Sequence, residues 1–216
     1  MTVVLLVRHG LTEATGRRLV GWSPGVHLSP AGRDQAERAA ERLASLRIRA
    51  VYSSPLERCL ETARPLASRL GLAVRRREAL GEVRYGEWTG RSLAQLSRTA
   101  LWRQVQMVPS NVRFPAGESF LEVQHRVVGE LRRIVAAHPR ALVAVYSHAD
   151  VIKLVVAHLS GMHQDLFQRL VIEPASVSAI AVGDGVPRIL RVNDTGDLAA
   201  LQPRGRPKRR ATKVRG

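Results

Sequence analysis

Two short runs of apolar residues, Val3–Val7 and Ala141–Tyr146, constrain the fold of this chain more than any other feature. Neither run alternates apolar with polar residues, and such continuous runs are typical of strands that are buried on both faces of a sheet. Further strand-like segments lie at residues 50–53, 72–75, 177–182 and 188–192. Because a sheet with buried central strands needs cover on both faces, helices are expected on each side of it.

The segments between these strands carry helix signals. Ser29 is placed to cap a helix over residues 31–46, with Pro30 in its first turn. The segments Ser54–Glu57 and Ser119–Glu122 both have capping-box spacing, and they open expected helices that run through Leu70 and Val135. Further helices are expected at residues 93–105 and 150–159. The alternation predicts an α/β fold, a three-layer sandwich with a mostly parallel central sheet and helices on both faces. In such sheets ligands bind at the carboxyl ends of the strands.

Length and charge indicate one domain with a basic tail. The chain has 216 residues, which suits one domain, expected over residues 1–202, and residues 203–216 carry seven basic residues and no acidic one. The net charge is +16, and 31 of the 34 basic residues are arginine. A basic body suits anionic substrates, and a basic tail, expected to be disordered, suits nucleic acid or simple solubility. No apolar run reaches the ~20 residues of a membrane span, and the run ending at Val7 is too short for a signal peptide, so a cytoplasmic location is expected.

A histidine follows each of the two apolar runs. Arg8-His9-Gly10 comes after the first run and Ser147-His148-Ala149 after the second. If the two strands are neighbours, the imidazoles face one another across a pocket at the ligand-binding edge of the sheet. Guanidinium groups match phosphate oxygens bidentately, and a neutral imidazole attacks phosphorus, so an arginine beside a histidine suits phosphoryl chemistry. Taken alone, the pattern is weak, because a lone histidine at a strand end is more often structural than catalytic.

Rival chemistries lack their sequence signatures. Cys59 is the only cysteine, and four residues separate it from Arg64, one fewer than the phosphate loop of a cysteine-dependent phosphatase requires. We therefore interpret Cys59 as a small buried residue on a helix. The sequence contains neither a phosphate-binding P-loop nor a dinucleotide-binding glycine motif, and it has no metal-binding histidine helix. We expect neither a metal ion nor a cofactor.

Five blocks of the sequence, in order, resemble the phosphoglycerate-mutase-like branch of the histidine phosphatase superfamily. The blocks are Leu6–Thr12, Leu28–Ala36, Tyr52–Ala63, Leu80–Gly90 and Val145–Ala149. The resemblance implies the fold described above and a catalytic domain over residues 1–202. Two departures affect the first loop: Leu11 replaces a polar residue that is common in the family, and Thr15 stands where an asparagine is frequent.

The resemblance also implies roles at matching positions. His9 would accept the phosphoryl group, and Arg8, Arg58 and His148 would hold its oxygens, with help from Thr12. Glu82 would protonate the leaving oxygen and then activate the acceptor, which requires a raised pKa. The carboxylates Glu87 and Glu118 are the reserve candidates for that acid.

The expected function is hydrolysis of a small phosphomonoester through a phosphohistidine, without a metal. A phosphomutase that uses the same residues is the first alternative. The second is a protein that binds nucleic acid or another polyanion through the basic tail. We expect no membrane partner, and the oligomeric state stays open, with a dimer among the options.

Overall fold

The computed structural model describes residues 1–183 and 185–196, which contain a six-stranded sheet of order β3-β2-β4-β1-β5-β6. Its strands are β1 (Thr2–Arg8), β2 (Ile48–Ser53), β3 (Val74–Arg76), β4 (Leu142–Ser147), β5 (Val177–Val182) and β6 (Arg188–Asp194). Strands β1 to β4 pair in parallel, whereas β5 is antiparallel to β1 and β6 is antiparallel to β5. The predicted α/β fold with a mostly parallel sheet is confirmed.

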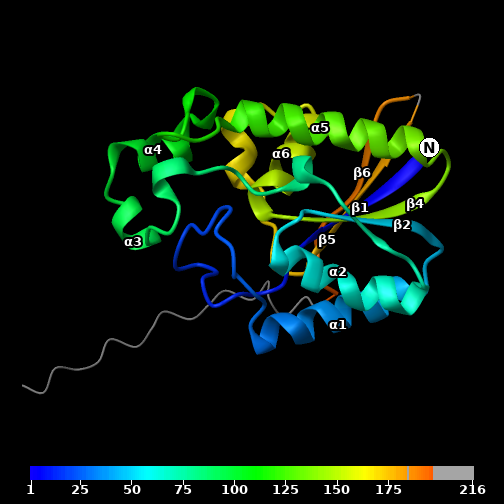
Figure 1. Ribbon diagram of the computed structural model, residues 1–216. Coiled ribbons are helices and arrows are strands. Elements are labelled where there is room, and N and C mark those ends of the chain that lie inside the picture. Colours follow the sequence, from blue (N-terminus) through cyan, green and yellow to red (C-terminus); the bar gives the residue numbers. More distant parts are fainter. Residues whose placement is uncertain (184, 197–216) are drawn as a thin grey trace, which may run out of the picture.

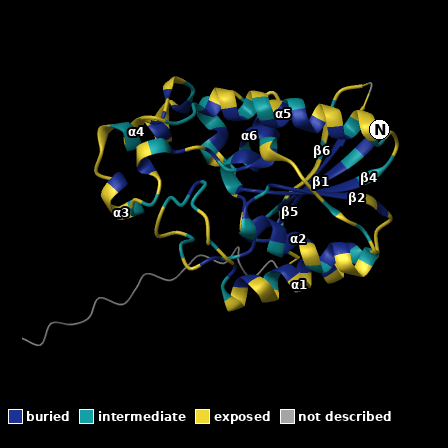
Figure 2. Ribbon diagram, viewed as in Figure 1, coloured by how far each residue is buried: buried dark blue, intermediate teal, exposed yellow. Residues whose placement is uncertain are grey.

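Helices cover both faces of this sheet, as predicted. Helices α1 (Pro30–Ala44) and α2 (Glu57–Leu70) lie below it in Figure 1, and α5 (Phe120–Ala137) and α6 (Ala149–Leu159) lie above it. Alternate residues of β1 serve the two layers: Val4 and Leu6 pack with the core under α5 and α6, while Leu5 and Val7 pack with that under α1 and α2. The central strands β1, β2, β4 and β5 are accordingly buried. The exposed residues lie on the outer surfaces of the helices, in loops and on the edge strands β3 and β6 (Figure 2).

Two helices begin at the capping residues that the sequence predicts. Ser29 Oγ accepts a hydrogen bond from the backbone of Gly32 at the start of α1, where Pro30 is the first helical residue. At the start of α5, Ser119 Oγ accepts from the Glu122 backbone at 3.2 Å, and the Glu122 carboxylate accepts from the Ser119 backbone at 2.8 Å. Both capping motifs satisfy backbone donors that the first helical turn leaves free.

The capping box predicted at Ser54 is wrong. Helix α2 begins at Glu57, and its N-cap residue is Leu56, which has no side-chain cap. The hydroxyl of Ser54 lies 2.8 Å from His148 Nε2 and accepts a hydrogen bond from the Leu56 backbone. A contact distant in sequence therefore orients this serine, which local spacing assigns to the helix.

The single helix predicted over residues 93–105 is also wrong, because two short helices occupy the segment. These are α3 (Leu93–Leu96) and α4 (Ala100–Met107). Thr99 divides them, since its hydroxyl donates to the Leu96 carbonyl and accepts from the Trp102 backbone. Together they stand beyond the carboxyl ends of the strands, at the left of Figure 1. The 3₁₀ helix η4 (Gln164–Arg169), which follows α6, was not predicted.

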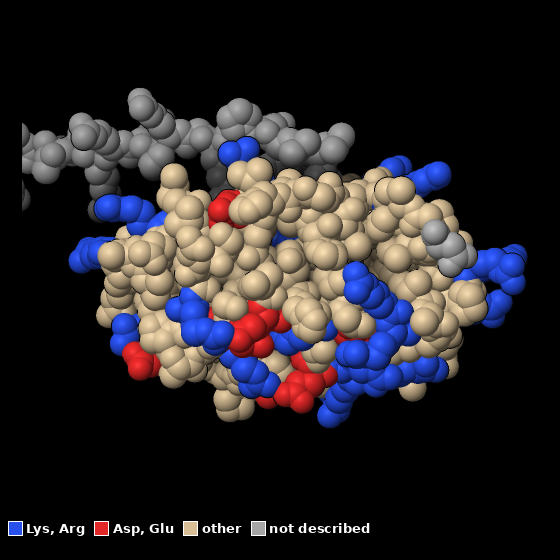
Figure 3. Space-filling view, turned by 90° about the horizontal axis from the view of Figure 1, so that it is seen from above, with Lys and Arg blue, Asp and Glu red and all other residues tan. Residues whose placement is uncertain are grey.

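The predicted tail at residues 203–216, and the predicted domain end at residue 202, lie outside the described residues. Within the described body, arginine side chains gather at the end of the molecule that carries the N-terminus, seen from the side of α5 in Figure 3. Among the helices of the described chain, none combines the length and the apolar character that a membrane span requires.

Two glycines let the loop after β1 lie directly against the start of α1. A Cβ on Gly32 would lie 2.0 Å from the Leu11 carbonyl oxygen, and one on Gly10 would lie 2.5 Å from the Gly32 carbonyl oxygen. The backbone of Gly10 also donates to Thr62 Oγ1, which ties the loop to α2. These contacts fix the segment that carries His9.

We expect Gly32→Ala to lower the free energy of unfolding by about 1–3 kcal/mol, because the added methyl group forces backbone atoms apart. Gly129→Ala, within α5, is the matched control, because a Cβ there meets no atom within 4 Å. It should raise stability by about 0.4–1 kcal/mol. Urea denaturation of both variants measures the difference, and equal stability of the two would contradict the close approach.

Candidate active site

The two histidines that follow the apolar strands face each other. Strands β1 and β4 pair in parallel with Arg8 opposite Ser147, which places His9 and His148 at neighbouring strand ends. Their ring centroids lie 5.3 Å apart, and the ring planes are inclined by 62°. The expectation that the two strands are neighbours is confirmed.

The imidazole of His9 presents one free nitrogen. Its Nδ1 lies 2.8 Å from the Gly10 carbonyl oxygen, which only accepts hydrogen bonds, so Nδ1 carries the proton and Nε2 keeps its lone pair. Burial, followed by the positive charges of Arg58 and Arg8, lowers the pKa of His9 well below its usual value. A neutral imidazole with an unshared pair on Nε2 is the form required of a nucleophile.

His148 is fully buried beside the first histidine. Its Nδ1 lies 3.3 Å from Arg58 Nη2, which only donates, so the proton resides on Nε2 and is donated to Ser54 Oγ. Glu82 Oε2 is 3.7 Å from the same Nδ1. Burial and the charge of Arg58 lower the pKa of His148 well below its usual value. Cys59 packs behind the ring with its thiol buried, as the sequence indicated.

Two arginines, Arg58 buried and Arg8 half-buried, have buried donor atoms without a hydrogen-bond partner in the described part of the chain. Arg58, at 1% exposure, donates from Nη2 to the Gly21 carbonyl, while its Nε and Nη1 have no partner among the described residues. Arg8 donates from Nη1 to the Ile172 carbonyl, and its Nε has no partner within the same part of the chain. Because an unsatisfied buried donor is costly, these groups indicate a place for an anion.

Thr12 completes this group of donors. It is buried, and its hydroxyl lies 3.0 Å from that of Thr15, whose oxygen also accepts from the Thr12 backbone. Thr15 thus orders the loop in place of the amide that the family often has. Both threonines line the pocket that Arg8 and Arg58 also line.

The surroundings of Glu82 favour the protonated form of its carboxyl group. Its Oε1 accepts from the Val83 backbone at 3.0 Å. Burial, with a contribution from the negative charge of Asp150, raises the pKa of Glu82 to about 7. Near neutral pH this carboxyl group therefore carries a proton much of the time, which a general acid requires.

Sequence reasoning missed Arg126, which holds the loop around Glu82. From α5, its guanidinium donates to the carbonyl oxygens of Ala79, Gly81 and Glu82, at 2.8 to 2.9 Å. It also pairs with Glu118 at 2.8 Å. Glu118 is thereby engaged in the scaffold and is a poor candidate for the acid. A single arginine on the polar side of a predicted helix carries no motif that reveals this role.

These residues surround a pocket of about 430 Å³ at the carboxyl ends of the strands. Five of the six predicted site residues line it, namely Arg8, His9, Thr12, Arg58 and Glu82, and the sixth, His148, is fully buried. The wall also includes residues that were not predicted, such as Tyr85, Asp150, Lys153 and Gln168. The structure thus gathers the predicted residues at one place.

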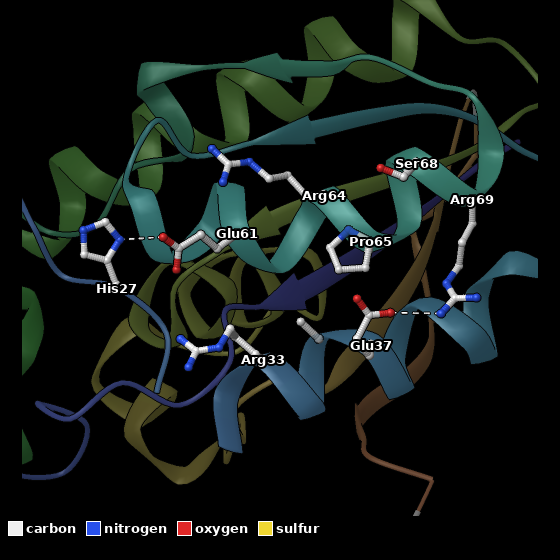
Figure 4. Close-up of a pocket in the computed structure, with 9 residues that line it drawn as sticks. His27, Arg33, Glu37, Glu61, Arg64, Pro65, Ser68 and Arg69 are labelled. Carbon is white, nitrogen blue, oxygen red and sulfur yellow. Dashed lines mark hydrogen bonds and ion pairs between the residues drawn. The ribbon is translucent and has the colours of Figure 1, made fainter. Parts of the chain in front are cut away.

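A second hollow lies between α1 and α2 and shares no lining residue with this pocket. It measures about 700 Å³. Its side chains bind each other: His27 is hydrogen-bonded to Glu61, and Arg69 forms an ion pair with Glu37 (Figure 4). Size therefore does not select the functional site here. In the described part of the chain, no three His, Cys, Asp or Glu residues group so as to hold a metal ion.

The chain matches the model of a known protein family. The model of the histidine phosphatase superfamily (branch 1) matches residues 4–195. The chain therefore belongs to that superfamily.

Several known proteins are similar to the chain. Phosphoserine phosphatase 1 of Hydrogenobacter thermophilus is 30% identical over 92% of this chain and 95% of its own length. A bifunctional protein of Mycobacterium tuberculosis is 34% identical over 91% of the chain, which spans only 55% of that relative. The solved structure of a mycobacterial glucosyl-3-phosphoglycerate phosphatase with VO3 superposes with a TM-score of 0.82, at 28% identity, over 89% of this chain and 98% of the other.

The pKa shifts at the site are directly testable by NMR. Because burial and Arg58 depress the pKa of His9 and His148, both imidazoles should stay neutral between about pH 8 and about pH 6. Nitrogen chemical shifts of the imidazoles, assigned with His9→Ala and His148→Ala, measure this. The Glu82 carboxyl carbon, assigned with Glu82→Gln, should titrate near pH 7. Histidine titration near pH 6.5, as in an unfolded peptide, would contradict the described electrostatics.

Proposed function

We propose that the protein hydrolyses a small phosphomonoester by transferring the phosphoryl group to His9 and then to water, without a metal ion. The observation that carries the proposal is the free Nε2 of a neutral His9, beside buried donor atoms of Arg8 and Arg58 that have no partner among the described residues. A nucleophile and an anion site at one position are the two requirements of phosphoryl transfer.

The first step moves the phosphoryl group onto the enzyme. Arg8 and Arg58 hold its oxygens, with Thr12 as a further donor, and the bond from His9 Nε2 to phosphorus forms as the ester P–O bond breaks. Glu82 gives its proton to the leaving oxygen, and the alcohol departs. The dianionic group should raise the pKa of the adjacent His148, which then takes up a proton from solvent, donates it in a hydrogen bond to a phosphoryl oxygen, and returns it to solvent when phosphate leaves.

The second step returns the phosphoryl group to water. Glu82, now a carboxylate, takes a proton from a water molecule that attacks phosphorus. The N–P bond breaks, phosphate leaves, and His9 is neutral again. Glu82 thus ends protonated, as it began, so no external proton donor is needed over the cycle.

The similar proteins support this proposal. Two of them are named for phosphatase activity, and one was solved with VO3, a vanadium oxyanion whose chemistry is close to that of a phosphoryl group. In this chain the same kind of anion would meet Arg8 and Arg58. The pocket volume of about 430 Å³ suits a small metabolite rather than a macromolecule.

A phosphomutase is the alternative, because the same residues serve it if an alcohol replaces water in the second step. Binding of a polyanion through residues 203–216 stays a prediction, as does the cytoplasmic location. The oligomeric state also stays open.

We expect His9→Ala to abolish release of phosphate from a panel of phosphomonoesters, because no other side chain at the site has a free nucleophilic nitrogen. His125→Ala, an exposed position on α5, is the control and should keep wild-type rates. Assays in EDTA should give the same rates, since the proposed steps use no metal. Added acceptor alcohols separate the alternatives: net transfer to the alcohol indicates a mutase. Full activity of His9→Ala would overturn the proposal.

Glu82 and Arg58 should differ in their dependence on the leaving group. Glu82→Gln cannot donate a proton, so it should slow an alkyl phosphate by ~10²–10⁴-fold and affect para-nitrophenyl phosphate much less. Arg58→Ala should slow both substrates about equally, by ~10²–10³-fold, because both carry the same phosphoryl group. Burst kinetics must first establish that phosphorylation of His9 limits the rate. Equal losses in Glu82→Gln would remove it from the acid role.

A further inference from the structure

One lysine distinguishes the wall of the candidate active site. The chain has 31 arginines but three lysines, and two of the lysines lie in residues 203–216. The third, Lys153, is on α6 and lines the pocket. In a chain that uses arginine at almost every basic position, a lysine at this place indicates that the compact ammonium group has a function that the planar guanidinium does not supply.

The contacts of Lys153 form a small polar cluster. Its Nζ donates to Gln168 Oε1 at 3.0 Å and lies 3.5 Å from Asp150 Oδ1. It also lies 5.9 Å from the centre of the Phe167 ring. Both Asp150 and Gln168 line the pocket. The side chain of Lys153 is 15% exposed, so the cluster is largely withdrawn from solvent yet reachable from the pocket.

The cluster lines the same pocket as Glu82. Asp150 Oδ2 accepts a hydrogen bond from Tyr85 at 3.1 Å. Glu82, Tyr85 and Asp150 all line the pocket, and the negative charge of Asp150 is one cause of the raised pKa of Glu82. If Glu82 protonates the leaving oxygen, the carbon skeleton attached to that oxygen extends along this wall. Lys153, Asp150 and Gln168 are then the groups that it meets.

The donors and acceptors of the cluster fit one kind of ligand group. After its contacts with Gln168 and Asp150, the ammonium group has one N–H left, the Gln168 amide nitrogen has donors, and the Asp150 carboxylate has spare lone pairs. A lone carboxylate here is attracted by Lys153 but faces the like charge of Asp150, and a lone ammonium group is attracted by Asp150 but faces the like charge of Lys153. A hydroxyl group both donates and accepts, so it suffers neither repulsion.

Resting on the proposed function, we propose that Lys153, Asp150 and Gln168 form a subsite for hydroxyl groups of the leaving alcohol, which makes the substrate a polyol or sugar phosphate. A substrate carboxylate would instead be bound by Arg18, which also lines the pocket and whose guanidinium donates to the Gly90 carbonyl.

Four phosphate esters with the same primary three-carbon skeleton test the subsite. They are glycerol 3-phosphate, n-propyl phosphate, 3-phosphoglycerate and phosphoserine, with para-nitrophenyl phosphate as the measure of the chemistry alone. For the wild type we expect kcat/KM on glycerol 3-phosphate to exceed that on n-propyl phosphate by about tenfold, equivalent to ~1.4 kcal/mol. It should also exceed the values on the two carboxylate-bearing esters.

Variants assign the preference to the cluster. Lys153→Met should reduce the ratio of kcat/KM between glycerol 3-phosphate and n-propyl phosphate from about tenfold towards one. Gln168→Leu should reduce it in the same direction, and it serves as the test if Lys153→Met does not fold. Arg169→Met removes an exposed positive charge next to Gln168 in η4 and should leave the ratio unchanged.

The outcomes separate this inference from the proposed function. A higher kcat/KM on 3-phosphoglycerate or phosphoserine overturns the hydroxyl subsite and leaves the phosphatase proposal intact. A preference for glycerol 3-phosphate that survives both Lys153→Met and Gln168→Leu would also overturn the subsite and leave the phosphatase proposal intact. Hydrolysis of para-nitrophenyl phosphate alone would do the same. No hydrolysis of any of the five esters would overturn the proposed function itself.

Discussion

The parallel pairing of β1 with β4 is the constraint on which the rest of the site depends. Its register sets Arg8 opposite Ser147 and so brings His9 and His148 to one edge of the sheet, with ring centroids 5.3 Å apart. A shift of this register by one residue would turn each side chain of β1 to the opposite face of the sheet. The contacts that alternate residues of β1 make with the two cores would then also be lost. Burial of Leu5, Leu6 and their neighbours therefore positions the chemistry as well as stabilising the fold.

Burial then separates the protonation states of the site residues. The same desolvation that lowers the pKa of His9 and His148 raises that of Glu82, because it penalises the charged form of each group. Arg58 and Arg8 reinforce the effect on His9, and Asp150 reinforces the effect on Glu82. Burial thus favours neutral imidazoles beside a carboxyl group that is protonated much of the time near neutral pH, at the place where the arginines attract an anion.

The sequence predicted what depends on local pattern and missed what depends on distant contacts. The apolar runs, the histidines after them and the cap at Ser119 follow from local pattern, and the structure gathers the predicted site residues around one pocket. The orientation of Ser54 towards His148 depends on a partner distant in the chain, and the loop contacts of Arg126 depend on the tertiary fold. The break at Thr99 was missed because helix periodicity continues across it.

The most direct test of the account is the position of the phosphoryl group on the trapped enzyme. The reaction is quenched in alkali, where phosphohistidine survives, and the protein is examined by phosphorus NMR and peptide mass spectrometry. Because Nδ1 of His9 is hydrogen-bonded to the Gly10 carbonyl oxygen, the account predicts the Nε2 isomer of phosphohistidine at position 9. Phosphate on Nδ1, on His148, or on a residue outside the pocket would contradict it.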